Sequence, residues 1–439
     1  MNATAKEVMQ FIKENDVKFI RLAFCDLFGM QKNISIMPDE LEAVFNDGIS
    51  FDASAIKGFS DVTMSDLLLF PDPSTLSVLP WRPQQGRVAR FYCEIRHPNG
   101  EIFECDSRAI LKRVLAKCEK MGYVCNVGAE CEFYLFKTDA AGNPLLEPHD
   151  NGGYLDISPL DRGENVRREI CLTLADMGLH PECSHHEQGP GQNEVDFKFS
   201  NAMSGADNIM TFKTVVKALS LRNGLFASFM PKPLLNKAGN GMHINLSLTE
   251  NGYNIFKNGN VAQNKVVEGF IAGILEKIRE ITLFLNPITN SYERLGAFEA
   301  PRFVSWSYNN RSQLVRIPAA SGDKIRMELR SPDTACNPYI ALALIIEAGL
   351  NGIKKGLALP KAIDKNLYDS DIVKALTLQK LPESLKEAIN ITKTSVFVKE
   401  IIGEGVLEKY IREKEAEAEE FEKAESKEEF YIDKYFLRI

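Results

Sequence analysis

Four short segments of the chain alternate apolar residues with charged or hydrogen-bonding residues, and this alternation is the strongest constraint on the fold. The segments are YVCNVGAECEFYLF (123–136), QNEVDFKF (192–199), GMHINLSL (241–248) and KIRMELRS (324–331). In a β-strand, residues two apart in sequence point to the same face. The pattern therefore predicts strands of an antiparallel sheet with one apolar and one polar face.

The residue types on the polar face are unusual for a surface in water. They are Glu130, Glu132, Glu194, Asp196, Lys198, His243, Asn245, Ser247, Arg326, Glu328 and Arg330. An ordinary half-buried sheet gives the same alternation and is the simpler explanation of any single strand. However, Glu130 and Glu132 are like charges on one face, which is unfavourable unless a cation lies between them. Glutamate and histidine suit divalent cations, and arginine suits phosphates and carboxylates.

Three other stretches carry residues of the same chemistry. HHEQGPGQNE places Glu187 and Glu194 at the two ends of a Gly-Pro-Gly turn, and NNRSQLVRIP contributes Arg311 and Arg316. NPITNSYERLGAFEAP has the composition of a mobile active-site loop. The alternatives are unrelated acids, surface charges and an ordinary loop. His185 and His186 are interpreted as structural hydrogen-bonding groups and not as ligands.

If these groups share one cavity, its glutamates carry five negative charges, from Glu130, Glu132, Glu187, Glu194 and Glu328. Two divalent cations would offset most of that charge, whereas burying the carboxylates alone costs several kcal/mol each or forces protonation. The sequence has no GxxxxGK[ST] loop and no protein-kinase signature. From the residues alone, we predict a metal-dependent enzyme of phosphoryl transfer.

Composition narrows the class of protein further. The 439 residues carry a net charge of −8, which argues against nucleic acid as the main partner. Apolar runs are too short to span a bilayer, and charges interrupt the N-terminal stretch where a signal peptide would be apolar. Nine cysteines without a CxxC pair predict reduced, mostly buried thiols. We therefore expect a cytoplasmic protein with no membrane or nucleic-acid partner.

Periodicity predicts helices over 4–15, over 107–121 with Ser107 as N-cap, and within 335–358. Between them, 30–105 is rich in short β-like runs and predicts a small domain that ends near 105. The stretch 405–427 is dense in Glu and Lys and is interpreted as a solvated helix. The terminal FYIDKYFLRI has aromatic residues that need a packing partner.

Several motifs, in this order, resemble the glutamine synthetase family, in its bacterial type I, α-like branch. They are FDASAIKGF, VGAECEF, HHEQGPGQNEVDF, MPKPLLNKAGNGMHINLSL, NPITNSYERLGAFEAP, NNRSQLVRIP and RMELRSPD. The resemblance implies an α+β fold. A small N-terminal β-grasp domain would span 1–105, and a large catalytic domain would span 106–439. The large domain would be built on a curved antiparallel sheet flanked by helices and would end in a helical tail.

The activity implied by the resemblance is ATP-dependent condensation of ammonia with glutamate through γ-glutamyl phosphate, giving glutamine, ADP and phosphate. ATP would be a cosubstrate, with two or three Mg²⁺ or Mn²⁺ ions per site. Two alternatives stay open. One is a γ-glutamyl ligase that uses an alkylamine or polyamine, and the other is a non-catalytic structural or regulatory relative.

The resemblance also assigns roles residue by residue. One metal would be held by Glu132, Glu187 and Glu194, and another by Glu130, His243 and Glu328. The catalytic residues would be Asp52, Glu299 and Arg311. Substrate would be bound by Arg294, Arg330, Gly239 and Tyr154. The nucleotide side would comprise Glu182, Phe199, Asn245, Ser247, Arg316, Lys324 and Arg326.

The implied assembly is a dodecamer of two hexameric rings with sites between subunits, in which Asp52 comes from the neighbour and the C-terminal tail reaches into the opposite ring. A regulatory protein partner is also expected. The sequence departs from the family at the acceptor side, where Ala55 and Ala238 replace polar residues and the loop between Arg294 and Glu299 is one residue short. Asp61 stands where the branch has an arginine for glutamine feedback, and Tyr368 lies in a context similar to an adenylylation site.

Overall fold

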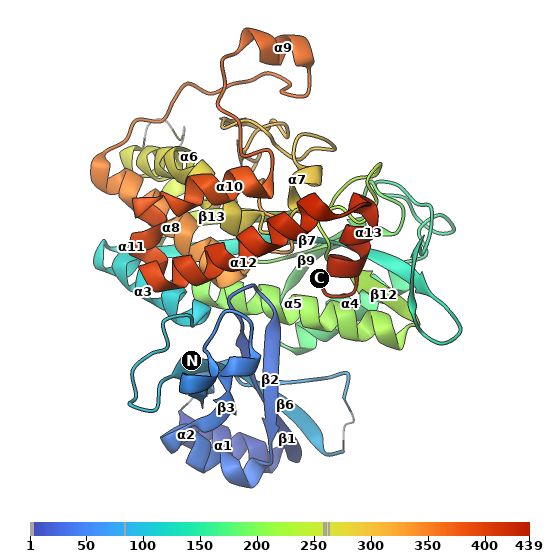
Figure 1. Ribbon diagram of the computed structural model, residues 1–439, viewed down its shortest axis with the longest axis vertical. Coiled ribbons are helices and arrows are strands. Elements are labelled where there is room, and N and C mark those ends of the chain that lie inside the picture. The colour runs from blue at the N-terminus through green and yellow to red at the C-terminus, as the bar shows by residue number, and fades with distance from the viewer. Residues whose placement is uncertain (1–3, 83–84, 258–260, 262–263) are drawn as a thin grey trace.

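The computed structural model describes residues 4–82, 85–257, 261 and 264–439, and it divides into a small and a large β-sheet unit (Figure 1). Within the described residues, the small sheet has six strands in the order β2-β1-β6-β4-β3, with β5 paired to β6. Among the strand pairs that the structure describes in this sheet, only β1 and β6 run parallel. The strands are β1 Val17–Cys25, β2 Gln31–Ile36, β3 Ile49–Asp52, β4 Asp66–Pro71, β5 Ser77–Val78 and β6 Arg87–Arg96.

Helices α1 (Ala5–Glu14) and α2 (Leu41–Asp47) lie at the far end of the small unit. The helix predicted over 4–15 is confirmed as α1, and Thr4 and Glu7 cap its start through reciprocal hydrogen bonds. The helix predicted over 107–121 is confirmed as α3 (Ser107–Lys120), but Ser107 is not its N-cap. Asp106 is the N-cap, because its carboxylate accepts from the amides of Arg108 and Ala109.

The large unit is built on a sheet that has eleven strands among the described residues, in the order β15-β16-β17-β13-β7-β10-β9. Strands β8, β11 and β12 pair with β7, and β14 pairs with β13. The strand pairs in the described part of this sheet are antiparallel except β15–β16. Its strands are β7 Tyr123–Thr138, β8 Pro144–Pro148, β9 Pro181–His186, β10 Gln192–Phe197, β11 Ser200–Asn201, β12 Leu225–Ser228, β13 Met242–Glu250, β14 Tyr253–Asn254, β15 Trp306–Tyr308, β16 Val315–Ile317 and β17 Met327–Leu329.

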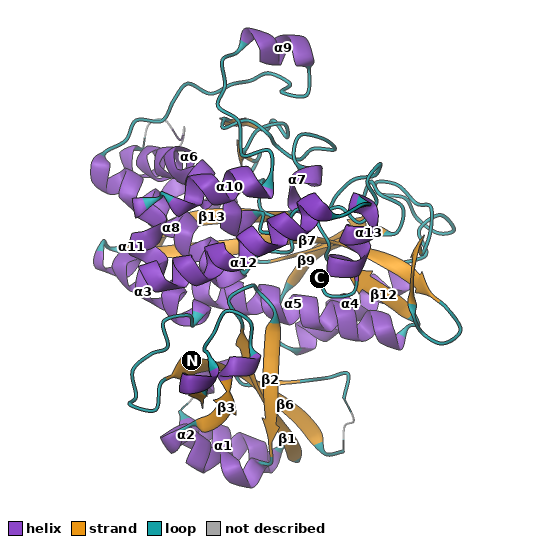
Figure 2. Cartoon of the chain, in the orientation of Figure 1, coloured by secondary structure: helices purple, strands orange, loops and turns teal. Residues whose placement is uncertain are grey.

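The predicted strand alternation holds, because the residues assigned to the apolar face join one hydrophobic core. Helices cover the sheet and pack on one another beside it (Figure 2). They are α4 Glu164–Asp176, α5 Ala202–Arg222, α6 Lys265–Leu285, α7 Ser291–Arg294, α8 Pro338–Lys355, α9 Ser370–Ala375, α10 Leu385–Lys393, α11 Val396–Ile402, α12 Glu404–Lys423 and α13 Lys427–Tyr431. The helix predicted within 335–358 is confirmed as α8.

Helices α6 and α8 approach each other at glycines. A Cβ placed on Gly273 would lie 2.2 Å from the carbonyl oxygen of Ala348, and one on Gly352 would lie 2.0 Å from that of Gly269. Any larger side chain at these positions would force the helices apart.

The C-terminal region departs from the sequence interpretation in two ways. Helix α12 is not simply solvated, because Val406, Leu407, Tyr410 and Ile411 form a buried face. The terminal aromatics do not depend on another subunit for packing. Within the same chain, they form a hydrophobic cluster whose buried members are Tyr134, Phe136, Met230, Ile288, Ala335, Tyr431, Tyr435 and Phe436. The sequence could not reveal this partner because β7 lies some three hundred residues earlier in the chain.

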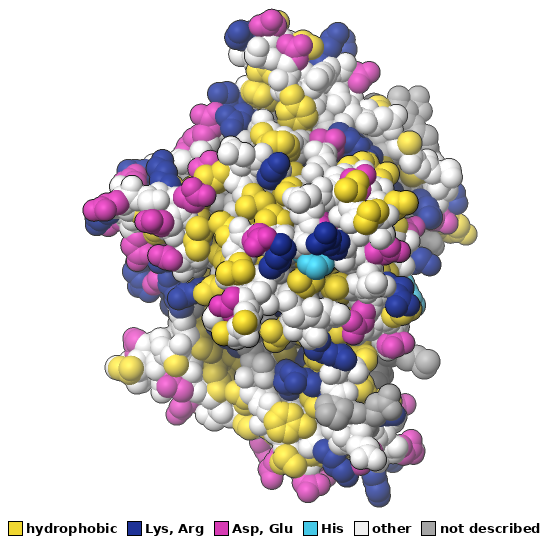
Figure 3. Space-filling model, turned by 90° about the vertical axis from the view of Figure 1, so that its right-hand side faces the viewer, with side chains coloured by type: hydrophobic (Ala, Val, Ile, Leu, Met, Phe, Trp, Pro, Cys, Tyr) yellow, Lys and Arg dark blue, Asp and Glu magenta, His cyan; other side chains and the backbone are white. Residues whose placement is uncertain are grey.

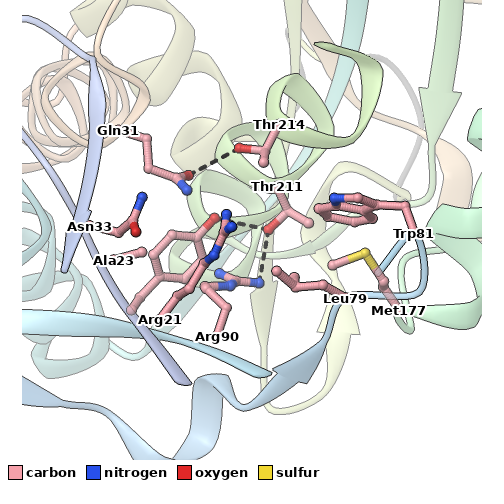
Figure 4. A pocket seen from close by; sticks show the side chains of 11 residues that line it. Arg21, Ala23, Gln31, Asn33, Leu79, Trp81, Arg90, Met177, Thr211 and Thr214 are labelled. Atoms are coloured by element: carbon pink, nitrogen blue, oxygen red, sulfur yellow. Dashed lines mark hydrogen bonds between the residues drawn. The ribbon is translucent and has the colours of Figure 1, made fainter. Parts of the chain in front are cut away.

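The two units meet where the small sheet faces α5 (Figure 4). The Tyr92 hydroxyl lies 2.9 Å from the Thr211 hydroxyl, and Nη2 of Arg90 donates to the same oxygen at 3.2 Å. A cavity of about 20 Å³ remains between them, which is room for a water molecule. These contacts hold the small unit against the helix layer of the large one.

The nine cysteines are free, and seven of them are buried, as predicted. Among the described residues, none of the helices has the length and apolarity that crossing a bilayer requires. On the face shown in Figure 3, positive and negative side chains are interspersed.

Candidate active site

The polar face of the large sheet forms the floor of a cavity of about 500 Å³. Strand register creates this floor, because directly paired residues share a face. Asp196 pairs with Glu130, which pairs on its other side with His243. Glu194 pairs with Glu132. The neighbouring strands β10, β7 and β13 thus present four carboxylates and a histidine side by side.

Most of the residues predicted for the site line this cavity. They are Glu130, Glu132, Tyr154, Glu187, Glu194, Gly239, His243, Arg294, Glu299, Arg311, Arg316, Arg326 and Arg330. Glu328 is fully buried directly beside it and bonds Arg316 and Arg330. Asp52, Glu182, Phe199, Asn245, Ser247 and Lys324 do not line it.

Glu130, His243 and Glu328 form one compact ligand group. They each offer a ligand atom within 4.8 Å of the others. The Nδ1 atom of His243 lies 3.3 Å from Oε2 of Glu130, whose Oε1 accepts from Asn245 at 2.8 Å. Burial raises the pKa of Glu130, but the hydrogen bonds from His243 and Asn245 outweigh it and hold that pKa at about 2. This group therefore stays negative and suits a divalent cation.

Glu187 and Glu194 form a second group with His185, within 4.8 Å of one another. The ring nitrogens of His185 lie 3.6 Å from Glu187 and 3.8 Å from Glu194. His185, which the sequence interpretation left out as a structural hydrogen-bonding group, therefore lines the cavity beside two of the predicted ligands. The signal was present in the sequence, because His185 and Glu187 are two residues apart. His186 lies on the opposite side of the strand, where its Nε2 is 2.9 Å from Asp150 in the interior.

Glu132 lies in the same cavity but outside the second group. Its Oε2 accepts from Gln192 at 3.0 Å and from the amide of Gly241 at 2.9 Å. Burial and the nearby Glu187 raise the pKa of Glu132 to about 8. Burial and the neighbouring acids Asp196 and Glu132 also raise the pKa of Glu194 well above its usual value. Acids in this state favour a cation strongly, so the donor set fits divalent metal.

Arginines surround the acids. Arg316 donates to Glu328 at 2.7 Å, and the buried Arg330 also bonds Glu328. Arg294 is buried and is oriented by the carbonyls of Ser331 and Arg330, at 2.9 and 3.2 Å. Fixed guanidinium groups of this kind suit carboxylate and phosphate recognition.

A short loop covers part of the cavity. Its residues Phe298 and Glu299 have left-handed backbone conformations, with φ of 49° and 66°. The Oε2 atom of Glu299 lies 3.7 Å from Arg330 and 3.8 Å from Arg311. The loop therefore brings one more acid to two of the cavity arginines.

The predicted residues that do not line the cavity lie beside it on the large unit or, for Asp52, on the small unit. Lys324 donates to Glu182 at 2.8 Å. Asn245 accepts from Arg326 at 2.7 Å and donates to Glu130 at 2.8 Å, so it contacts two residues that line the cavity. Ser247 is buried on β13 and Phe199 is exposed. Asp52 lies on the small unit, where it is exposed and caps Ser54 at 2.9 Å.

The loop at residues 238–241, which precedes β13, is held in place by hydrogen bonds to neighbouring segments. Asn240 is fully buried, and its Nδ2 donates to the carbonyl of Met230 at 2.9 Å. The carbonyl of Ala238 accepts from the Tyr134 hydroxyl at 2.7 Å, and that of Gly239 accepts from Gln192 at 3.1 Å. The backbone at Ala238 and Gly239 is therefore held by hydrogen bonds to β7 and β10.

Comparisons with known proteins agree on one family. The family descriptions "Glutamine synthetase, catalytic domain" and "Glutamine synthetase, beta-Grasp domain" match residues 104–432 and 16–98. Glutamine synthetase from Methanosarcina mazei is 46% identical over 423 residues, which are 95% of each chain. That from Clostridium saccharobutylicum is 44% identical over 423 residues, covering 95% of this chain and 96% of the relative.

Solved structures agree as well. A structure titled "GmaS/ADP complex-Conformation 1" superposes with a TM-score of 0.87 at 28% identity, covering 99% of both chains. Plasmodium falciparum glutamine synthetase gives 0.85 at 25% identity over 98% of both. The predicted fold class, a β-grasp domain followed by a larger domain on a curved antiparallel sheet, is confirmed.

Proposed function

The chain belongs to the glutamine synthetase family, and we propose that its acidic cavity is where ammonia is joined to glutamate. The enzyme is a glutamate–ammonia ligase that makes glutamine, ADP and phosphate from glutamate, ammonia and ATP through γ-glutamyl phosphate. The names and identities of the curated relatives favour ammonia over an alkylamine, and they favour catalysis over a purely structural role.

The observation that carries the proposal for the site is the convergence of two ligand groups in one cavity. Enzymes of this family use divalent metals. We assign one ion to Glu130, His243 and Glu328, and another to Glu187, Glu194 and Glu132. The oxygen-rich donor sets favour Mg²⁺ or Mn²⁺, at two or three ions per site. When bound, these cations would neutralise negative charge on the phosphates.

The arginines divide between the two substrates. Arg294 and Arg330 would bind the carboxylates of glutamate, because both are buried and held in place by neighbouring acceptors. Arg316 and Arg326 would bind the phosphates of ATP. Arg311 is half-exposed at the cavity mouth and would reach the phosphoryl group during transfer.

Two residues of the cavity rim complete the glutamate side. Gly239 offers a backbone close to Arg294, and Tyr154 stacks edge-on against His185 at 5.5 Å. Glu299 would close the loop over the intermediate and exclude water. On the nucleotide side we place Glu182, Phe199, Asn245, Ser247 and Lys324.

Asp52 would complete the site from a neighbouring subunit and take a proton from ammonium. Its exposed position on the small unit supports this role, because it is free to enter another chain's cavity. We propose a cytoplasmic dodecamer of two hexameric rings, a domain boundary after residue 105, and a regulatory protein partner. Asp61 caps Thr63 at 2.8 Å, so strong feedback inhibition by glutamine through this position is not expected.

A panel of acceptors tests the reaction. Phosphate release is measured with glutamate, ATP and Mg²⁺ in the presence of ammonia, methylamine or a polyamine, and the amide product is identified by mass. We expect ammonia to give the highest kcat/KM. A clear preference for an alkylamine would overturn the assignment, and absence of turnover with every acceptor would favour a non-catalytic relative.

A further inference from the structure

A third group of ligand atoms lies at the edge of the sheet, where it shares His185 with the second group. His185 and Asp196 line the cavity, and Cys183 lies outside its lining. Cys183 and His185 are two residues apart on the edge strand β9, so they share a face. Asp196 on β10 pairs directly with Cys183. Each of the three residues offers an atom within 4.8 Å of the other two.

One oxygen of this group has no partner within the described residues. The Cys183 thiol is exposed and donates to Oδ2 of Asp196 at 2.8 Å. Within the described part of the chain, Oδ1 of Asp196 is buried and has no hydrogen-bond partner. A buried acceptor left unpaired is uncommon and points to a ligand that the chain itself does not supply.

We propose that Cys183, His185 and Asp196 form a binding site for a thiophilic divalent cation of the Zn²⁺ class. A thiolate, an imidazole and a carboxylate are all zinc ligands, and three protein ligands leave a fourth position for water. On binding, the cation replaces the proton that the thiol shares with Asp196, and that proton passes to solvent.

This site differs from the neighbouring groups in the cations that it selects. Mg²⁺ prefers oxygen ligands in near-octahedral geometry, so a thiolate disfavours it. Zn²⁺ binds nitrogen and sulfur donors far more tightly than Mg²⁺ does. The Cys183 site therefore accepts Zn²⁺ even when Mg²⁺ is in large excess.

Sharing of His185 links this site to the group of Glu187 and Glu194. A ring nitrogen held by Zn²⁺ fixes the His185 ring beside Cys183. We therefore expect Zn²⁺ to weaken cation binding at the neighbouring group and to lower the rate of synthesis. The thiol makes this inhibition specific to thiophilic metals.

Cobalt titration of the full-length, metal-free protein tests the site without measuring activity. Co²⁺ is added in the presence of excess Mg²⁺, and the thiolate-to-cobalt charge-transfer absorption is recorded in the near ultraviolet. We expect one such band per chain, its loss in Cys183→Ser, and its removal by one equivalent of Zn²⁺. The Zn²⁺ affinity of Cys183→Ser, measured against a chromophoric chelator, should fall at least about tenfold, since even outer-shell changes have effects of that size.

The matched control is Cys171→Ser, which removes a partly buried thiol on α4 and should leave the band intact. Asp196→Asn should weaken Zn²⁺ binding but keep the thiolate band. Absence of the band from the wild-type protein, or its persistence in Cys183→Ser, would overturn the proposal. Neither result depends on whether the cavity makes glutamine.

Discussion

Glu132 on β7 lies directly opposite Glu194 on β10, and both carboxyl groups are buried in one cavity. Two buried acids in this arrangement repel each other when both are ionised. The repulsion is relieved when a proton or a cation neutralises one of the charges. The metal-free protein therefore stores an unfavourable interaction that a cation relieves.

The first prediction concerns Glu132→Gln in the absence of metal. The pKa of Glu132 is raised from 4.5 to about 8 by burial and by Glu187. A carboxyl whose pKa is higher in the folded state loses stability as pH rises from 4.5 through 8. We expect the variant to melt roughly 2–5 °C above wild type at pH 8, with little difference at pH 5. Differential scanning calorimetry at both pH values measures this.

The exposed Glu250→Gln at the end of β13 is the matched control, because its charge lies outside the cavity. In millimolar Mg²⁺, Glu132→Gln should melt below wild type, since this variant lacks a proposed metal ligand. A variant that melts below wild type at pH 8 without metal would contradict the electrostatic argument.

The second prediction is that metal binding releases protons. The pKa of Glu132 is about 8, so this carboxyl group holds a proton at pH 7. A divalent metal that binds Glu132 displaces this proton. Calorimetric titration with Mn²⁺ in two buffers of different ionisation enthalpy should show release of about one proton at pH 7 and less at pH 9. Equal heats in both buffers at pH 7 would refute it.

The third prediction concerns the cavity loop. Glu299→Gln removes a charge that lies 3.8 Å from Arg311 and 3.7 Å from Arg330. We expect kcat to fall roughly 10- to 100-fold through misplacement of the loop, with a larger share of ATP hydrolysed without glutamine formation. Parallel assays of phosphate and glutamine give this share. The control Glu383→Gln removes a surface pair with Arg302 at 3.2 Å and should leave both products coupled.

The fourth prediction tests the subunit origin of Asp52, which is exposed and lies outside its own chain's cavity. Asp52→Ala and Arg311→Ala should each abolish most activity. Oligomers assembled from equal amounts of the two variants should recover about one quarter of wild-type activity. In such a mixture, a site is intact when its own chain keeps Arg311 and the neighbouring chain keeps Asp52. No recovery after verified subunit exchange would show that both residues act within one chain.

Strand periodicity predicted the site better than any other feature. Alternation with period two fixes which side chains share a face, so Glu130, His243 and Glu328 could be grouped before any coordinates. It could not decide whether that face meets water or a cavity, since this depends on the loop at 295–300 and on packing far along the chain. The roles of Asp52 and Glu299 came only from the family resemblance.

The sequence-based assignments that the structure changes have local physical causes. His185 and His186 are adjacent in sequence but lie on opposite faces of β9. His185 therefore faces the cavity, and His186 faces the interior. Asp106 and Ser107 are both good N-caps, and the amide of Ile95, which donates to Asp106 at 2.9 Å, favours the aspartate. Which of two candidate residues caps a helix depends on contacts with distant parts of the chain, and sequence periodicity does not reveal these contacts.

The last prediction concerns the C-terminal aromatics. Phe436 is buried, with its ring 5.0 Å from that of Phe136 and 5.1 Å from that of Phe226 in the same chain. Phe436→Ala should lower the free energy of unfolding by about 3–5 kcal/mol and leave the oligomer mass unchanged. Leu437→Ala, at a position 62% exposed, should change stability by less than about 0.5 kcal/mol. If Phe436→Ala instead dissociates the oligomer without lowering subunit stability, the aromatic side chain packs against another subunit.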